Sequence, residues 1–195
     1  PIYFYITFLV PAIAFMAASS AMREEMKATT LDYVLTRPIP RPAFLGCKYL
    51  SHLACIQLDL LFAFVVVLAV GSFRGVTGLM AVVPQLLVCQ VLLATAFTAF
   101  GFLCGSLTTR YVVIGLIYGG LIEAGVGQIP TQLSRLSMTH QVRELLVPVV
   151  DHAVAAASVV SWLGTIAVLL AFTAFMLTAA ATVFSVSEHS GRADP

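Results

Sequence analysis

The chain has 195 residues, of which 60% are hydrophobic and only 10% are charged. Soluble globular domains carry about 25% charged residues, so this composition excludes an ordinary soluble protein. The formal net charge of +1 predicts neither a surface that binds nucleic acid nor an acidic tail. The composition therefore favours a polytopic membrane protein.

Five apolar stretches meet or approach the roughly 20 residues that a helix needs to cross a hydrocarbon core. These stretches are 2–21, 49–71, 79–107, 112–128 and 153–187. They are continuous rather than alternating, which favours helices over barrel strands, and a helix satisfies its own backbone hydrogen bonds in lipid. We expect an all-α fold, a polytopic transmembrane helix bundle in which residues 1–187 form one domain and 188–195 a tail.

Some of the expected spans contain irregular features. Pro11 is expected to kink the first span, because proline removes a backbone donor. The fourth span is short and rich in glycine, so we expect a bent or discontinuous helix. Such a segment could line a substrate route or place small residues at a tight helix contact. In the third span, four small residues could permit close helix contact: Ala94, Ala99, Gly101 and Gly105.

The ten basic residues are unevenly divided between the two sides of the membrane that alternating spans define. Seven lie in the 22–48 connection, the connection between the third and fourth spans, and the tail. Three lie in the 72–78 loop and the 129–152 segment. Because Lys and Arg favour the cytoplasmic side, we expect the first group and the C-terminus to be cytoplasmic, in the cell (inner) membrane.

The 22–48 connection begins with helix-forming residues and continues into a series of prolines at Pro38, Pro40 and Pro42. Ala28, Leu31 and Leu35 share one helical face, which predicts a short amphipathic helix. This helix could rest on anionic lipid through its Arg and Lys side chains. The order of its residues supports a second interpretation.

The segment MREEMKATTLDYVLTRPIPRPAFLGCK resembles the cytoplasmic segment of permease subunits of type-2 ATP-binding cassette (ABC) exporters. In that family, I-S-x-E-x-E-x-G-T-L-D is followed by L-L-x-R-P-I-x-R and by G-K at the next span. The matching positions include Glu25, Thr30, Leu31, Asp32, Leu35, Arg37, Pro38, Ile39, Arg41, Gly46 and Lys48. Arg23, Lys27 and Thr29 depart from the pattern.

A second stretch is also similar to this family, namely Gly101 to Arg110, then Glu123, then IPTQLSRLSMTHQVREL. In the last part, apolar residues recur at helical spacing and polar residues occupy the opposite face, which predicts an external amphipathic helix. That helix could cover the bundle, whereas the resemblance implies an extracellular gate. The family has six spans, and the five visible here lack the first, so we expect the N-terminus to be incomplete.

The resemblance implies a permease homodimer or heterodimer in membrane lipid that binds cytoplasmic ABC ATPase subunits. It further implies outward transport of an unidentified substrate by alternating access. The cytoplasmic segment would act as a coupling helix, with ATPase contacts carried over onto Glu25, Thr30, Leu31, Asp32, Arg37 and Arg41.

No catalytic residues are expected in this chain. A phosphate loop needs G-x-x-x-x-G-K-[ST], and neither Lys27 nor Lys48 has that context. ATP and Mg²⁺ are therefore expected on the partner ATPase, with no cofactor in this chain. The four histidines are scattered and do not favour a metal site. The alternatives from other classes are a membrane-embedded lipid-modifying enzyme and a non-transporting membrane scaffold.

Two carboxylates, Asp59 and Glu123, lie well within expected spans, where charge is costly and commonly functional. Asp59 is expected near the middle of the bilayer, where it needs protonation or a polar neighbour such as Gln90 or Thr95. Structural pairing and lining of a polar route both remain open for Asp59. Glu123 is similar in position to an acidic residue of the family, and we expect a structural or gating role.

Overall fold

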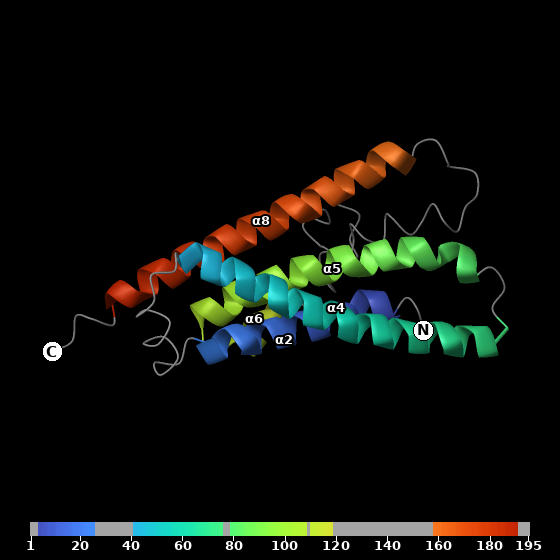
Figure 1. Ribbon diagram of the computed structural model, residues 1–195, viewed down its shortest axis with the longest axis horizontal. Coiled ribbons are helices and arrows are strands. Elements are labelled where there is room, and N and C mark those ends of the chain that lie inside the picture. The colour runs from blue at the N-terminus through green and yellow to red at the C-terminus, as the bar shows by residue number, and fades with distance from the viewer. Residues whose placement is uncertain (1–3, 26–40, 76–78, 109, 119–157, 191–195) are drawn as a thin grey trace.

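The computed structural model describes residues 4–25, 41–75, 79–108, 110–118 and 158–190. All the regular elements in these ranges are helices, and they lie side by side in an elongated bundle (Figure 1). The π-helix η1 covers Tyr5–Leu9, and the α-helices are α2 (Val10–Glu25), α4 (Arg41–Phe73), α5 (Leu79–Leu107), α6 (Tyr111–Ile117) and α8 (Ser158–Ser190). The expected fold class, an all-α membrane helix bundle, is confirmed.

Four helical stretches in the described ranges are long and apolar enough to cross a membrane: Tyr5–Glu25, Ala43–Phe73, Val82–Leu107 and Leu163–Phe184. They lie where we expected the first, second, third and fifth spans. Helix α6 occupies the beginning of the expected fourth span. The rest of that span and the expected external helix lie outside the described residues.

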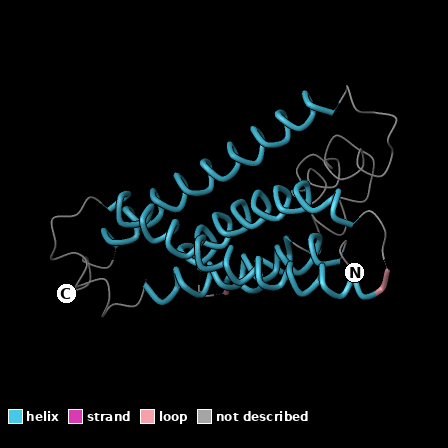
Figure 2. Tube along the Cα trace, turned by 45° about the vertical axis from the view of Figure 1, so that its right-hand side comes forward, coloured by secondary structure: helices cyan, strands magenta, loops and turns pink. Residues whose placement is uncertain are grey.

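The chain runs back and forth along the long axis of the bundle. The end of α2, the start of α4, the end of α5 and the end of α8 lie at one end, and the connection from α4 to α5 lies at the other (Figures 1 and 2). We call these the Glu25 end and the Phe73 end. The 26–40 connection therefore leaves and rejoins the bundle at the Glu25 end.

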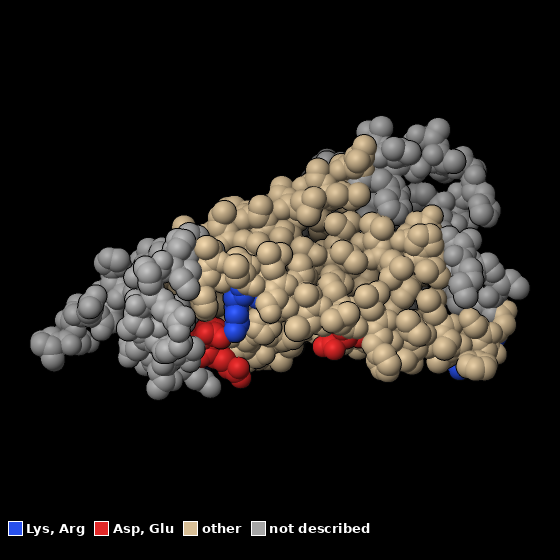
Figure 3. Space-filling view, in the orientation of Figure 1, with Lys and Arg blue, Asp and Glu red and all other residues tan. Residues whose placement is uncertain are grey.

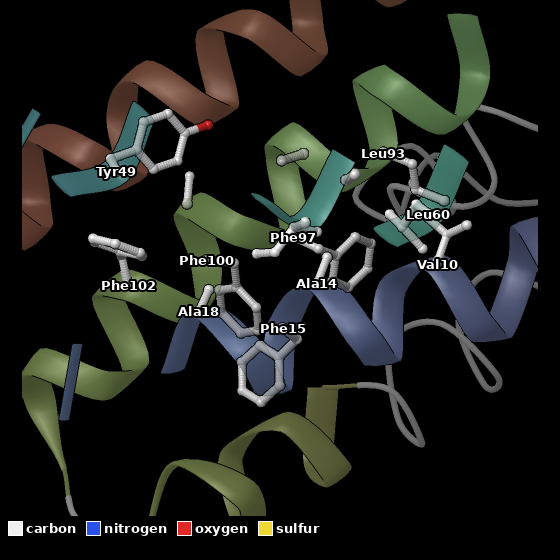
Figure 4. Close-up of a cluster of buried hydrophobic side chains, with 14 of the residues drawn as sticks. Val10, Ala14, Phe15, Ala18, Tyr49, Leu60, Leu93, Phe97, Phe100 and Phe102 are labelled. Carbon is white, nitrogen blue, oxygen red and sulfur yellow. The ribbon is translucent and has the colours of Figure 1, made fainter. Parts of the chain in front are cut away.

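Helix α5 is the central element, and its most extensive contacts are with α2 and α8. Its core side chains include Leu93, Phe97, Phe100 and Phe102, which pack with side chains of α2 and α4 (Figure 4). Helices α4 and α8 bury only a small share of their apolar surface in the bundle. Their remaining apolar side chains are free to face lipid or another protein.

The proline expected to disturb the first span lies just after the π-helical turn. The backbone N–H of Val10 bonds the carbonyl oxygen of Tyr5, five residues earlier, and Pro11 follows as the second residue of α2. Proline has no N–H to donate to the preceding turn. The wider turn before Pro11 accommodates this missing donor without ending the helix.

Candidate functional site

An ion pair joins the two helices that flank the 26–40 connection. Glu25 is the last residue of α2, and Lys48 lies in the second turn of α4. The Nζ atom of Lys48 donates a hydrogen bond to Oε1 of Glu25, and the side chains of Lys48 and Glu25 are 29% and 17% exposed, respectively. This contact brings together segments that are more than twenty residues apart in the sequence.

The first turns of α4 are also attached to α5. The hydroxyl of Tyr49 donates to the carbonyl oxygen of Thr95 at 3.0 Å. The rings of Tyr49 and His52 both approach Phe102 edge-on, with centroid distances of 5.7 and 6.1 Å. Aromatic pairs favour this geometry, so these contacts fix the start of α4 against α5.

Helix α2 packs against α5 at two glycines. A Cβ atom on Gly101 would lie 2.8 Å from the backbone oxygen of Phe15, and one on Gly105 would lie 2.6 Å from that of Ser19. Any side chain at these positions would push the helices apart. The close contact expected of the third span is therefore made within the chain, against α2, and this glycine face of α5 is covered.

A second polar junction lies deeper in the bundle and links η1, α4 and α5. The hydroxyl of Tyr5 lies 2.7 Å from the carbonyl oxygen of Leu60 and 2.9 Å from Oε1 of Gln90, so its single hydrogen is within donating distance of both oxygens. Gln57 of α4 donates from Nε2 to the carbonyl oxygen of Val91 at 3.2 Å. The Nε2 atom of the fully buried Gln90 has no hydrogen-bond partner among the described residues.

Asp59 does not join this junction. Its side chain is exposed on α4 and has no hydrogen-bond or ion-pair partner in the described part of the chain. Both expected neighbours of Asp59 have other partners. Gln90 is hydrogen-bonded to Tyr5, and the hydroxyl of Thr95 donates to the carbonyl oxygen of Val91 in its own helix. Figure 3 shows acidic atoms isolated on an otherwise uncharged stretch of the surface.

Helix α6 joins the bundle through aromatic rings. Tyr118 lies 4.7 Å from Phe100 and 6.1 Å from Phe97 between ring centroids, and Phe15 lies 5.3 Å from Phe100. Gly115 lies against the ring of Phe15, where a Cβ atom would be 2.3 Å from the ring. The other face of α6 is exposed and apolar, with Leu116 the most exposed at 70%.

The structure places only part of the predicted site. Glu25 ends α2 and Arg41 begins α4, whereas Thr30, Leu31, Asp32, Arg37 and Glu123 lie outside the described residues. Within the described ranges, no three His, Cys, Asp or Glu side chains are grouped so that they could hold a metal ion. The metal and cofactor expectations stay predictions.

Neither the pairing of Glu25 with Lys48 nor the role of Tyr5 was predicted from the sequence. Both residues of the ion pair were noted as family positions, but their pairing was not predicted. A carboxylate and an ammonium that flank a connection between two antiparallel spans were the available signal. Tyr5 lies in an apolar run and gave no signal.

Comparison with protein families finds a match to the model described as "ABC-2 family transporter protein" over residues 3–188. No curated protein and no solved structure matches the chain. The match covers nearly the whole sequence, including all the helices described above except the last two residues of α8. The chain therefore belongs to the ABC-2 family of transporter proteins and is a membrane permease of an ABC transporter.

Proposed function

We propose that this permease is the membrane subunit of an ATP-driven exporter in the cell membrane. It works as a homodimer or heterodimer and moves its substrate outward by alternating access. Separate cytoplasmic ATPase subunits, which carry ATP and Mg²⁺, supply the energy. The family match over residues 3–188 is the observation that carries this proposal.

The contact with the ATPase is assigned to the connection between α2 and α4. The two helices that flank it end and begin at the same end of the bundle (Figure 1). Arg23 and Lys48, on these helices, and Arg110, before α6, are also at this end, which supports a cytoplasmic location. The contact residues are Thr30, Leu31, Asp32 and Arg37 within the connection, and Arg41 at the first position of α4.

Alternating access needs helices whose positions can change relative to the ATPase. Helices α2 and α4 both continue from the connection across the bundle, so a displacement of the connection acts on two spans at once. Helix α6, with its exposed apolar face, is the candidate for a wall of the transport route. This apolar face would suit an amphiphilic substrate.

The test is affinity purification of the tagged full-length permease from mild detergent, followed by assay of the eluate for an ATP-hydrolysing subunit. We expect an ATPase to co-purify with the wild-type protein and to be lost with Arg37→Glu, because charge reversal would repel the contact surface. Arg74→Glu is the matched control, since Arg74 is exposed at the Phe73 end.

Retention of the ATPase by Arg37→Glu would overturn the assigned contact. Absence of any ATPase with the wild-type protein, in several detergents, would overturn the exporter and favour a lipid-modifying enzyme or a scaffold. Loss of the ATPase in both Arg37→Glu and Arg74→Glu would show a general effect of charge reversal and would also contradict the assigned contact.

A further inference from the structure

We propose that Glu25 and Lys48 form a clamp that makes α2 and α4 move as one unit, and that Glu25 acts through Lys48 rather than by touching the ATPase. This inference rests on the proposed function, because the movement in question is the one that the ATPase drives. It assigns Glu25 and Lys48 as positioning residues. The ATPase contact then falls to the residues after Glu25.

The number of residues in the 26–40 connection sets only an upper limit on the distance between the end of α2 and the start of α4. A stretch of this length could extend to about 50 Å when fully stretched. The ion pair instead holds the last residue of α2 against the second turn of α4. The end of α2 and the second turn of α4 are therefore held together by a contact between side chains.

The ion pair also completes a set of contacts among three helices at the Glu25 end. Helix α2 packs on α5 through Ser19 and Gly105, and α4 is fixed to α5 through Tyr49 and Phe102. The Glu25–Lys48 pair joins α2 directly to α4. With all three contacts in place, a force on the connection displaces α2 and α4 together.

The exposures of Glu24 and Glu25 distinguish a residue that holds two helices together from one that contacts the ATPase. Glu24 is exposed, whereas the Glu25 side chain is 17% exposed and its carboxylate is already bound to Lys48. An ATPase that needed a carboxylate at this end would reach Glu24 more easily. Glu24→Gln is therefore a matched control, with the same chemical change one position away.

The experiment measures the distance between spin labels at the two helix ends. The labels are placed by Glu24→Cys and Ser51→Cys, both exposed positions, in a full-length protein whose four native cysteines are replaced by alanine. The background is combined with Glu25→Gln, with Lys48→Gln, or with the exchanged pair Glu25→Lys and Lys48→Glu. Distances are recorded in lipid nanodiscs, for the chain alone and for its complex with the ATPase, before and after addition of ATP.

We expect one narrow distance distribution in the parent protein, unchanged by ATP, because α2 and α4 move together. Each single variant should broaden the distribution and raise the separated population roughly twofold to fivefold, the range for loss of a solvent-accessible ion pair. The exchanged pair should restore the narrow distribution. In an unlabelled background, ATPase co-purification should be retained in both single variants and in Glu24→Gln.

Two outcomes overturn the clamp. An unchanged distance distribution in both single variants would show that other contacts hold the helices. Loss of the ATPase in Glu25→Gln but not in Lys48→Gln would show that Glu25 contacts the ATPase directly. Failure of the proposed function would give a different result from failure of the clamp. The wild-type chain would then co-purify with no ATPase, while the label distance in the chain alone would still report the clamp.

Discussion

Polar side chains in this bundle differ in whether the fold gives them a partner. Glu25 and Lys48 form an ion pair at the Glu25 end, and Tyr5 is hydrogen-bonded to Leu60 and Gln90 inside the bundle. Asp59 is exposed on α4 and lacks a partner in the described part of the chain. Because a carboxylate in hydrocarbon is expensive, we expect Asp59 to lower the stability of the chain.

Replacing Asp59 by leucine should stabilise the permease on its own. An Asp at the centre of a membrane helix costs about 2.5–3.5 kcal/mol, and the substitution removes that cost. We expect a higher unfolding temperature for Asp59→Leu in nanodiscs and a smaller rise for the control Asp59→Asn, which keeps a polar group. A lower unfolding temperature for Asp59→Leu would show that the carboxylate has a partner in the assembled protein.

For single residues, the sequence indicated which side chains are costly at their positions but not which partners they have. The position of Asp59 within an apolar run identified it as costly, and that required no structure. Its neighbours could not be predicted, because helical spacing gives the face of a residue but not the helix that covers it. Gln90 is hydrogen-bonded to Tyr5, which lies far away in the chain. No feature of the sequence had marked Tyr5 as a partner.

The contact between α2 and α5 shows how glycines determine the distance between two helices. Gly101 and Gly105 are one turn apart on the face of α5 that touches Phe15, Ala18 and Ser19. Close backbone approach of this kind drives helix association in membranes, where apolar side chains gain little by leaving lipid. The contact therefore depends on the absence of a Cβ atom at these positions.

Gly105→Ala should destabilise the protein by roughly 1–3 kcal/mol, because the new methyl group would lie within 2.6 Å of the Ser19 oxygen and force the helices apart. The matched control is Gly164→Ala in α8, where a Cβ atom would meet nothing within 4 Å. That control should be neutral or more stable by up to about 1 kcal/mol, since alanine favours helix. Thermal unfolding in nanodiscs compares the two. Equal stability of both variants would contradict the close contact.

Helices were easier to predict from the sequence than their packing. Long apolar runs predict helices because lipid offers the backbone no other partner, and α4, α5 and α8 lie where such runs were found. The small residues of α5 indicated a close contact, but a single sequence could not say whether the partner helix belonged to the same chain. The π-helical turn before Pro11 was expected only as a kink, because a missing donor does not determine how the helix adjusts.

For the whole molecule, the arrangement of charge relates the bundle to the membrane. Arg23, Lys48 and Arg110 lie at the Glu25 end, and Arg74 lies at the Phe73 end. Figure 3 shows that the face between the two ends is almost free of basic side chains. Lys and Arg concentrate on the cytoplasmic side of short connections, so the Glu25 end should face the cytoplasm.

This orientation is tested with single cysteines at opposite ends of the bundle, in a background without native cysteines. Ser72→Cys lies at the end of α4 and Leu107→Cys at the end of α5, and both positions are exposed. A membrane-impermeant maleimide should label Ser72→Cys in intact cells and Leu107→Cys only after permeabilisation. The cysteine-free parent, which should not be labelled, is the control.

The reverse labelling pattern would have consequences beyond topology. It would place the connection between α2 and α4 outside the cell, where no cytoplasmic ATPase could reach it, and the ATPase contact would have to move to the Phe73 end. The Glu25–Lys48 pair would still join the two helices, but it would no longer adjoin the segment that receives the energy of ATP. The labelling result therefore decides whether the ion pair can serve coupling.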